Sequence, residues 1–355
     1  MKKLRDITVL VTASGAQFMP GLVNCLKNNG ERQIKIIGTD MSEDPTLSQL
    51  VDVYYKVPNA TDPGYIPRLL EICKKEKVTV LMPFMSSELI PLADHKKEFE
   101  DFGTLISISD KKSIENTTNK LNFYTFMKDH GLNTPRFASI HHHSELLEAC
   151  EICGYPENAV CVKATELSGS RGIRIIDPNI SRYDILFHEK PNSFYTTMDD
   201  LLSTLQEKEE IPEMMAMEYL PGKEGSVDLI ADNGNILYMA YRESNVNLHS
   251  IPQVATLVDN PEAFKIAKDV ISALKLTGNA DLDFKADANG QPVLMEINPR
   301  IAATMQIFKE GGLNFPYLRI KHLLRERLPK IEITNGIIMK RRYLEMFYNI
   351  NYNPN

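Results

Sequence analysis

The stretch that most constrains the fold runs from Asn279 to Arg300 and consists of two alternating segments joined by Asn289-Gly290. Asn-Gly is the dipeptide that two-residue β-hairpin turns prefer, because both central residues adopt a positive φ. A hairpin built on this turn pairs Ala288 with Gln291 next to it. The stretch therefore predicts a β-hairpin whose register can be counted outward from the turn.

The predicted hairpin has one polar and one apolar face, because side chains alternate between the two faces of a strand. On the polar face, Asp283 lies opposite Glu296, and Asp281 lies opposite Asn298, with Arg300 beyond them. The other face is expected to pack on the core and carries Leu282, Phe284, Ala286, Val293, Met295 and Ile297.

The two facing carboxylates, Asp283 and Glu296, indicate a cation site or a solvated polar face. Like charges directly opposite each other weaken a sheet, and a cation between them reverses that effect. Carboxylates with an amide nearby suit Mg²⁺, which usually completes its coordination with substrate phosphates. From the hairpin alone, the solvated face stays open as the alternative.

Composition indicates a soluble globular protein with two or three packed units. The chain has 355 residues, of which 43% are hydrophobic and 25% are charged. Asp and Glu outnumber Lys and Arg by 47 to 40 without any basic block, so we expect no nucleic-acid partner. The apolar run near the N-terminus is too short for a signal peptide, and no run suits a membrane helix. We therefore expect a cytoplasmic protein without membrane association.

The cysteines and histidines are interpreted as structural. An odd cysteine count without a secretory signal predicts reduced thiols. Cys150 and Cys153 have the spacing of a redox or metal motif, but no second pair accompanies them, and they fall in a predicted helix. The run from His141 to His143 is expected to be a solvated loop that leads into this helix.

Residues 1–112 alternate short apolar strands with helices, which predicts a right-handed, doubly wound parallel sheet. Ligands of such sheets bind beyond the carboxyl ends of the strands. The loops at 14–17, 40–42 and 83–88 therefore lie at the expected substrate end. Because the dinucleotide pattern G-x-G-x-x-G is absent, a small substrate held by backbone amides fits better than NAD. A sheet that only supports the next domain is the alternative.

A second informative stretch covers residues 159–176, read as two strands around a Gly/Ser-rich loop at 168–172. Lys163 points to the face opposite Val160 and Val162. Such a loop can lay N–H groups over phosphate oxygens, with Lys163 adding charge, and a flexible turn is the alternative. Before it, residues 113–130 are predicted to form one helix with Lys120 in its middle.

Towards the C-terminus, residues 243–256 are polar and irregular, and we predict a substrate-facing loop there. Residues 313–328 are predicted to form the last helix. Residues 336–348 alternate enough for an edge strand, which closes a sheet either within the chain or across a homodimer.

In chain order, these features resemble the ATP-grasp superfamily, most closely ligases similar to one half of the carbamoyl-phosphate synthase large subunit, a group that includes the pyrrolysine-pathway amino-acid ligase. The resemblance extends to about residue 328. It implies an α/β protein: an N-terminal Rossmann-like pre-ATP-grasp domain (1–112) before the ATP-grasp fold. That fold would comprise a small subdomain with the phosphate loop (113–200), a C-terminal subdomain with the metal site (201–330), and a C-terminal strand extension (331–355).

The resemblance implies ATP and Mg²⁺ as cofactors, with one or two metal ions and Mn²⁺ as a substitute. Lys120 and Lys163 would contact the nucleotide phosphates. The loop closing over them would consist of Ser168, Gly169, Ser170, Arg171 and Gly172. Glu218 and the backbone of Tyr219 and Leu220 would hold the adenine edge, and Glu224 would bind the ribose hydroxyls.

The resemblance also assigns the metal and catalytic residues. Asp283, Glu296 and Asn298 would bind Mg²⁺. Arg300 would face the transferred phosphoryl group, with Arg242 and Lys163 assisting catalysis. Asp281 is left either as a contact for a substrate amine or as a structural residue.

The implied activity is that of an ADP-forming ligase that joins a small carboxylate, such as an amino acid, to an amine through an acyl-phosphate. Full carbamoyl-phosphate synthesis from glutamine is not expected, because the chain has one such half and no amidotransferase part. Three alternatives stay open: an acyl- or carboxy-phosphate-forming enzyme with another acceptor, a non-catalytic nucleotide-binding regulator, and, least favoured, a dinucleotide-dependent oxidoreductase.

Overall fold

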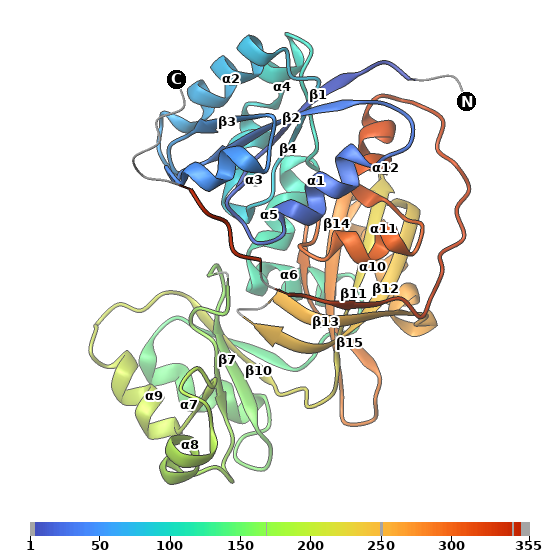
Figure 1. The fold of residues 1–355 in the computed structure, drawn as a ribbon. Coiled ribbons are helices and arrows are strands. Elements are labelled where there is room, and N and C mark those ends of the chain that lie inside the picture. Colours follow the sequence, from blue (N-terminus) through green and yellow to red (C-terminus); the bar gives the residue numbers. More distant parts are fainter. Residues whose placement is uncertain (1–3, 168, 249–250, 343, 349–355) are drawn as a thin grey trace.

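The computed structural model describes residues 4–167, 169–248, 251–342 and 344–348 (Figure 1). The described chain forms three sheets, with strand orders β3-β2-β1-β4-β5, β6-β10-β7-β8-β9 and β15-β14-β11-β12-β13-β16. Among the described residues, no helix combines the length and the apolar character that crossing a membrane needs.

The first sheet is parallel throughout and carries helices on both faces, which confirms the predicted doubly wound domain. Val9 and Val11 pack on one face and Leu10 on the other, which explains the continuous apolar run of the first strand. The strands are β1 (Ile7–Val11), β2 (Ile34–Asp40), β3 (Val53–Lys56), β4 (Val80–Met82) and β5 (Leu105–Ile106). The helices are α1 (Met19–Lys27), η1 (Pro45–Gln49), α2 (Tyr65–Glu76), α3 (Ser86–Asp94) and α4 (Lys96–Glu100).

Two helices connect this domain to the second sheet, where a single helix over 113–130 is predicted. They are α5 (Lys111–Thr118) and α6 (Lys120–Asp129). The break falls at Asn119, whose extended backbone and side chain, accepting from the N–H of Asn122, cap the second helix. Lys120 is therefore the first residue of α6 rather than a mid-helix residue.

The second sheet forms a separate lobe, drawn in green at the lower left of Figure 1. Its strands are β6 (Phe137–Ile140), β7 (Val160–Ala164), β8 (Arg174–Ile176), β9 (Tyr195–Thr196) and β10 (Met214–Glu218). Its helices are η2 (His143–Glu145), α7 (Leu146–Ile152), α8 (Arg182–His188) and α9 (Met198–Leu205). Cys150 and Cys153 lie buried in its core as free thiols, and burial raises the pKa of each to about 12.

The third sheet is antiparallel and positions the polar hairpin. Its strands are β11 (Glu224–Asp232), β12 (Asn235–Leu248), β13 (Ile251–Val258), β14 (Gly278–Ala286), β15 (Pro292–Asn298) and β16 (Ile338–Lys340). Its helices are α10 (Pro261–Leu274), α11 (Met305–Glu310) and α12 (Phe315–Leu323). Residues of α11 and α12, such as Met305 and Tyr317, also belong to the core that α1 forms with the first sheet, and so join the two domains.

Three predictions for the C-terminal half are wrong in extent or kind. Residues 243–248 and 251–256 belong to the paired strands β12 and β13 instead of a loop, while residues 249–250 lie outside the described residues. The last helix, α12, ends at Leu323, well before residue 328. The edge strand is limited to β16, and it pairs with β13 of the same chain, which settles the alternative in favour of closure within the chain.

Candidate active site

The β14–β15 hairpin places Asp283 opposite Glu296 and Asp281 opposite Asn298, which confirms the predicted register for the polar residues. Nearer the turn the prediction is wrong, because the register shifts by one residue after Asp283. The turn is also longer than two residues: the Asp287 carboxylate accepts from the N–H groups of Asn289 and Gln291, so Asp287, not Ala288, pairs with Gln291.

The register shift changes which side chains reach the core. Leu294 pairs with Phe284 and packs with it on the side of α10, so Met295 is the extra residue of a β-bulge. Val293 and Met295 turn instead towards a different apolar cluster that includes Tyr124. The prediction that Val293 and Met295 share a face with Leu282 is therefore wrong.

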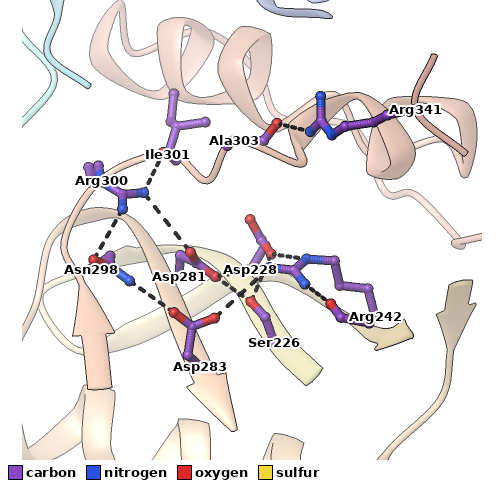
Figure 2. Close-up of polar contacts among 11 residues, drawn as sticks. Ser226, Asp228, Arg242, Asp281, Asp283, Asn298, Arg300, Ile301, Ala303 and Arg341 are labelled. Atoms are coloured by element: carbon purple, nitrogen blue, oxygen red, sulfur yellow. Dashed lines mark hydrogen bonds and ion pairs between the residues drawn. The ribbon is translucent and has the colours of Figure 1, made fainter. Parts of the chain in front are cut away.

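Two of the three predicted metal ligands, Asp283 and Asn298, form a hydrogen-bonded row with Arg300 (Figure 2), and the third, Glu296, lies opposite Asp283 across the strand pair. The side-chain amide of Asn298 donates to Asp283 Oδ2 at 3.1 Å, and its Oδ1 accepts from Arg300 Nη2 at 3.1 Å. Desolvation and the neighbouring carboxylates of Asp281 and Glu296 raise the pKa of Asp283 well above its usual range. A divalent cation would relieve this repulsion, so the donor set of two carboxylates and one amide oxygen fits Mg²⁺.

This donor set fits a cation that is also coordinated by oxygen atoms of a substrate. Within the described parts of the chain, no group of three His, Cys, Asp or Glu side chains is arranged to hold a metal by itself. Only two of the three predicted ligands are carboxylates, and the Asp283 and Glu296 side chains are 37% and 38% exposed. The remaining coordination positions would therefore be open to phosphate oxygens of a substrate.

Beside this row lies a buried ionic cluster around Arg242. Its Nη2 lies 3.9 Å from both Asp281 Oδ1 and Asp283 Oδ1, and its Nε lies 3.9 Å from Asp228 Oδ2. Its Nη1 donates to the Ser244 hydroxyl at 2.6 Å. The guanidinium is thus enclosed by three carboxylates, as Figure 2 shows, which places Arg242 in the same network as the predicted metal ligands.

Sequence reasoning missed two members of this cluster, Ser226 and Asp228 of β11. The Ser226 hydroxyl contacts both Asp228 and Asp281. Burial, followed by the charge of Asp281, raises the pKa of Asp228 well above its usual range. The available signal was a single carboxylate, Asp228, two positions after Ser226 in the otherwise apolar segment SVDLIA, since only a paired charge is tolerated in a buried strand.

The two predicted phosphate lysines come from different elements: Lys120 begins the connecting helix α6, and Lys163 lies in β7 of the second sheet. Lys120 Nζ lies 3.7 Å from Glu296 Oε2 and donates to the carbonyl of Leu167 at the base of the glycine-rich loop. Lys163 is buried, with its Nζ 5.2 Å from the centre of the Tyr124 ring. Burial lowers the pKa of Lys163.

The glycine-rich loop follows β7, and its backbone needs glycine. Ser168 lies outside the described residues, while Gly169, Ser170 and Gly172 have φ values of +66°, +61° and +72°. A Cβ atom added to Gly172 would lie 2.9 Å from the Cβ of Ala164. Arg171 lies exposed in the loop, between Ser170 and Gly172. The loop therefore packs closely on the strand that carries Lys163.

The predicted adenine and ribose residues lie at the junction of β10 and β11. Glu218 ends β10 and forms an ion pair with Arg136 at 3.1 Å, and Glu224 begins β11, 3.9 Å from Lys285. Tyr219 and Leu220 connect the two strands, and Leu220 is buried in the same cluster as Val293. An apolar surface thus adjoins the segment that is predicted to hold the adenine.

The substrate-end loops of the first sheet are tied together by one buried carboxylate. Glu88 Oε2 accepts from the Thr12 hydroxyl at 2.6 Å and from the backbone N–H groups of Phe84 and Met85. A second carboxylate, Asp40 at the end of β2, accepts from the N–H of Gly15 in the loop after β1 at 2.9 Å. The loops after β1, β2 and β4 therefore form one connected surface.

Comparison with known families identifies two segments of the chain. Residues 210–342 match the family described as ATP-grasp in the biosynthetic pathway with Ter operon. Residues 9–107 match the family described as PylC-like, N-terminal domain.

The similar curated proteins include carbamoyl phosphate synthase large chains. That of Clostridium beijerinckii is 24% identical over 328 residues, which cover 89% of this chain and 28% of the relative. That of Methanosarcina barkeri is 23% identical over 273 residues, covering 72% of this chain and 23% of the relative. This chain thus spans less than a third of either relative.

Similar solved structures share the fold at low identity. N5-carboxyaminoimidazole synthetase from Staphylococcus aureus complexed with ADP has a TM-score of 0.66 at 18% identity, covering 94% of this chain and 82% of its own. L-amino acid ligase from Bacillus licheniformis has a TM-score of 0.63 at 17% identity, covering 92% of this chain and 75% of its own. Both confirm the predicted α/β architecture.

Proposed function

Because this chain is an ATP-grasp protein with a PylC-like N-terminal domain, we propose that it is an ADP-forming ligase that joins a small carboxylate to an amine. The substrates of this proposal are an amino acid or another small carboxylate, a small-molecule amine, and ATP with Mg²⁺. The similar structures support the class, since they include an amino-acid ligase and a synthetase in complex with ADP.

The observation that carries the proposal is the row formed by Asp283, Asn298 and Arg300, with Glu296 opposite Asp283 and Lys120 of α6 3.7 Å from Glu296. Phosphoryl transfer needs neutralised charge and in-line placement more than covalent help from the protein. When bound, Mg²⁺ supplies that neutralisation at the β- and γ-phosphates. A row of carboxylates that is bordered by lysine and arginine suits this chemistry better than a hydride transfer.

In the proposed reaction, a carboxylate oxygen of the first substrate attacks the γ-phosphorus, and the bond to the β-phosphate oxygen breaks, releasing ADP. The amine nitrogen then attacks the acyl carbon, and phosphate leaves with one oxygen of the original carboxylate. Lys120 and Lys163 would hold the phosphates, and Arg300 would stabilise the charge of the transferred group, with Arg242 beside it. The loop at 168–172 would exclude water, because an acyl-phosphate hydrolyses readily.

A second candidate is an enzyme that forms a carboxy-phosphate and passes it to another acceptor. It is favoured by the similarity to biotin carboxylase from Campylobacter jejuni, with a TM-score of 0.66 at 14% identity. A non-catalytic regulator is less well supported, because the polar row and both lysines are present together. A homodimer is also proposed, and since β16 pairs within its own chain, it would form through another surface.

ADP release from Mg·ATP tests the proposal across a matrix of amino acids and small carboxylates, each paired with amines. The double variant Asp283→Asn/Glu296→Gln removes both charges of the row and should give no turnover. The matched control is Asp259→Asn/Glu262→Gln, the same pair of changes at exposed positions, which should keep full activity. Full activity of the first variant would overturn the proposal, and product mass spectrometry separates an amide from a carboxylated acceptor.

A further inference from the structure

The C-terminal end of the described sheet is tied to the candidate active site by a single arginine. Beyond β16, the backbone N–H of Arg341 donates to the carbonyl of Gln253 at 2.8 Å, which continues the pairing with β13. Its side chain then reaches two further carbonyls: Nε donates to Pro252 at 2.9 Å, and Nη2 donates to Ala303 at 2.7 Å. The guanidinium therefore joins the edge of the sheet to the turn that follows β15.

That turn, residues 299–304, carries Arg300 and has no regular secondary structure. The Arg300 side chain is fixed by the turn itself: Nη1 donates to the carbonyl of Ile301 at 3.1 Å, and Nη2 donates to Asn298 Oδ1. The N–H of Arg300 also donates to the carbonyl of Asn298 at 2.7 Å. A displacement of the turn would consequently move both the Arg300 guanidinium and the amide that orients Asp283.

We propose that Arg341 is a positioning residue, which sets the location of the Arg300 turn by holding the carbonyl of Ala303 at a fixed distance from β13. This inference rests on the proposed function, because it assigns a consequence to the placement of Arg300. In Figure 2, the turn lies between the Arg300 and Arg341 side chains, so Arg341 acts through Ala303 and not on the reacting groups. The C-terminal extension thereby becomes part of the catalytic apparatus.

Arginine suits this role because its planar guanidinium presents several donors in a fixed fork, whereas a lysine ammonium is a single flexible point charge. The turn is otherwise well packed, since Ile301, Ala302 and Thr304 are buried. The strut to β13 therefore fixes the position of the turn and also limits how often its backbone opens.

The test compares Arg341→Ala and Arg341→Lys with Arg342→Ala. Arg342 is an exposed neighbour whose Nη1 donates only locally, to the carbonyl of Arg341, so its variant loses the same charge without losing the strut. For a substrate pair found in the ADP-release matrix, Arg341→Ala should lower kcat about a hundredfold, as expected for a misplacement of about 1 Å. The KM for MgATP should stay within about twofold, because Arg300 acts on the transition state.

Arg341→Lys should retain an intermediate kcat, added methylguanidinium should restore part of the activity of Arg341→Ala, and Arg342→Ala should match the unmodified protein. Unchanged kcat in Arg341→Ala would overturn the inference. Equal losses of kcat and of MgADP affinity, without rescue by methylguanidinium, would also overturn it, because they would indicate a merely structural role. Hydrogen exchange of the backbone amides over residues 299–305 is a test that needs no substrate. The exchange rate should rise in Arg341→Ala and not in Arg342→Ala. If no pair supports turnover, the proposed function fails, and unchanged exchange alone overturns the positioning role.

Discussion

Asp283 and Glu296 lie directly opposite each other across the β14–β15 hairpin, with Asn298 donating to Asp283 and Lys120 3.7 Å from Glu296. Two carboxylates in this position destabilise the metal-free sheet, because like charges repel across a strand pair. The pKa of Asp283 is raised first by desolvation and then by repulsion from Asp281 and Glu296, while Arg242 and Arg300 lower it. The hairpin is thus locally destabilised without metal, and a bound cation would offset this destabilisation.

The first prediction is that Asp283→Asn stabilises the protein when divalent cations are removed. The variant relieves the repulsion, while its amide oxygen can still accept from Asn298, so the free energy of unfolding should rise by about 1 kcal/mol. Urea denaturation in the presence of a chelator measures this. The variant should also lose the stabilisation that Mg·ADP gives to the unmodified protein. A less stable variant without metal would contradict the assignment of the row as a cation site.

A second prediction concerns Lys163 and alkaline pH. Burial lowers its pKa from the ordinary value of 10.5, and only its cationic form attracts phosphate. As the pH rises through the lowered pKa, the charge is lost, so the Kd of MgADP should begin to increase at a pH below 10.5, the ordinary pKa of a lysine. Calorimetric titration measures the affinity. Lys163→Arg should show a flatter profile, because a guanidinium stays protonated; identical profiles would contradict a phosphate role for Lys163.

The third prediction concerns the buried Glu88 that joins the loops after β1 and β4. Burial raises its pKa above the ordinary value of 4.5, despite hydrogen bonds from Thr12 and from the backbone of Met85. A raised pKa means that the folded state retains the proton more strongly than the unfolded state does, so stability is lost as the pH rises from 4.5 through the folded pKa. The stability of the unmodified protein relative to Glu88→Gln should therefore fall as the pH rises above 4.5.

Urea denaturation at several pH values checks this expectation. The control is Glu100→Gln, the same substitution at an exposed position of the same domain, whose difference from the unmodified protein should hardly change with pH. A relative stability that rises with pH would show that Glu88 is stabilised as a carboxylate, and the sign argued from burial would be wrong.

Gly172 provides a fourth prediction, for the loop that is proposed to close over the nucleotide. Gly172→Ala combines a positive φ with a Cβ contact of 2.9 Å to Ala164, whereas Gly169→Ala has the positive φ but no atom within 4 Å of the added Cβ. The first variant should weaken MgADP binding more than the second, because the loop must shift away from the strand that carries Lys163. Equal affinities of the two variants would show that this close packing does not matter for binding.

The polar half of the site could be predicted from the sequence because strand alternation fixes which residues of one hairpin face each other. Asp283, Glu296 and Asn298 needed only the period of a strand and an approximate turn. The doubly wound first domain followed in the same way, from apolar runs that alternate with helices. These features are local, or repeat regularly along the chain.

The rest depended on contacts that local patterns do not encode. The bulge at Met295 arises from the way the hairpin packs, and it turned two predicted core residues to the other face. The β12–β13 hairpin is polar, so its pairing could not be inferred from apolar alternation. Likewise, Arg341 reaches Ala303 only because β16 returns to the edge of the sheet. The spacing of residues in the sequence does not predict this arrangement.

The central claim, formation of an acyl-phosphate, is tested most directly by the fate of the carboxylate oxygens. A carboxylate substrate labelled with ¹⁸O, incubated with ATP, Mg²⁺ and the amine found in the matrix, should transfer one labelled oxygen to inorganic phosphate, and ADP should appear in equal amount. Mass spectrometry of the phosphate and chromatography of the nucleotide give both readouts. Labelled AMP with unlabelled pyrophosphate would mean adenylate chemistry and would contradict the account.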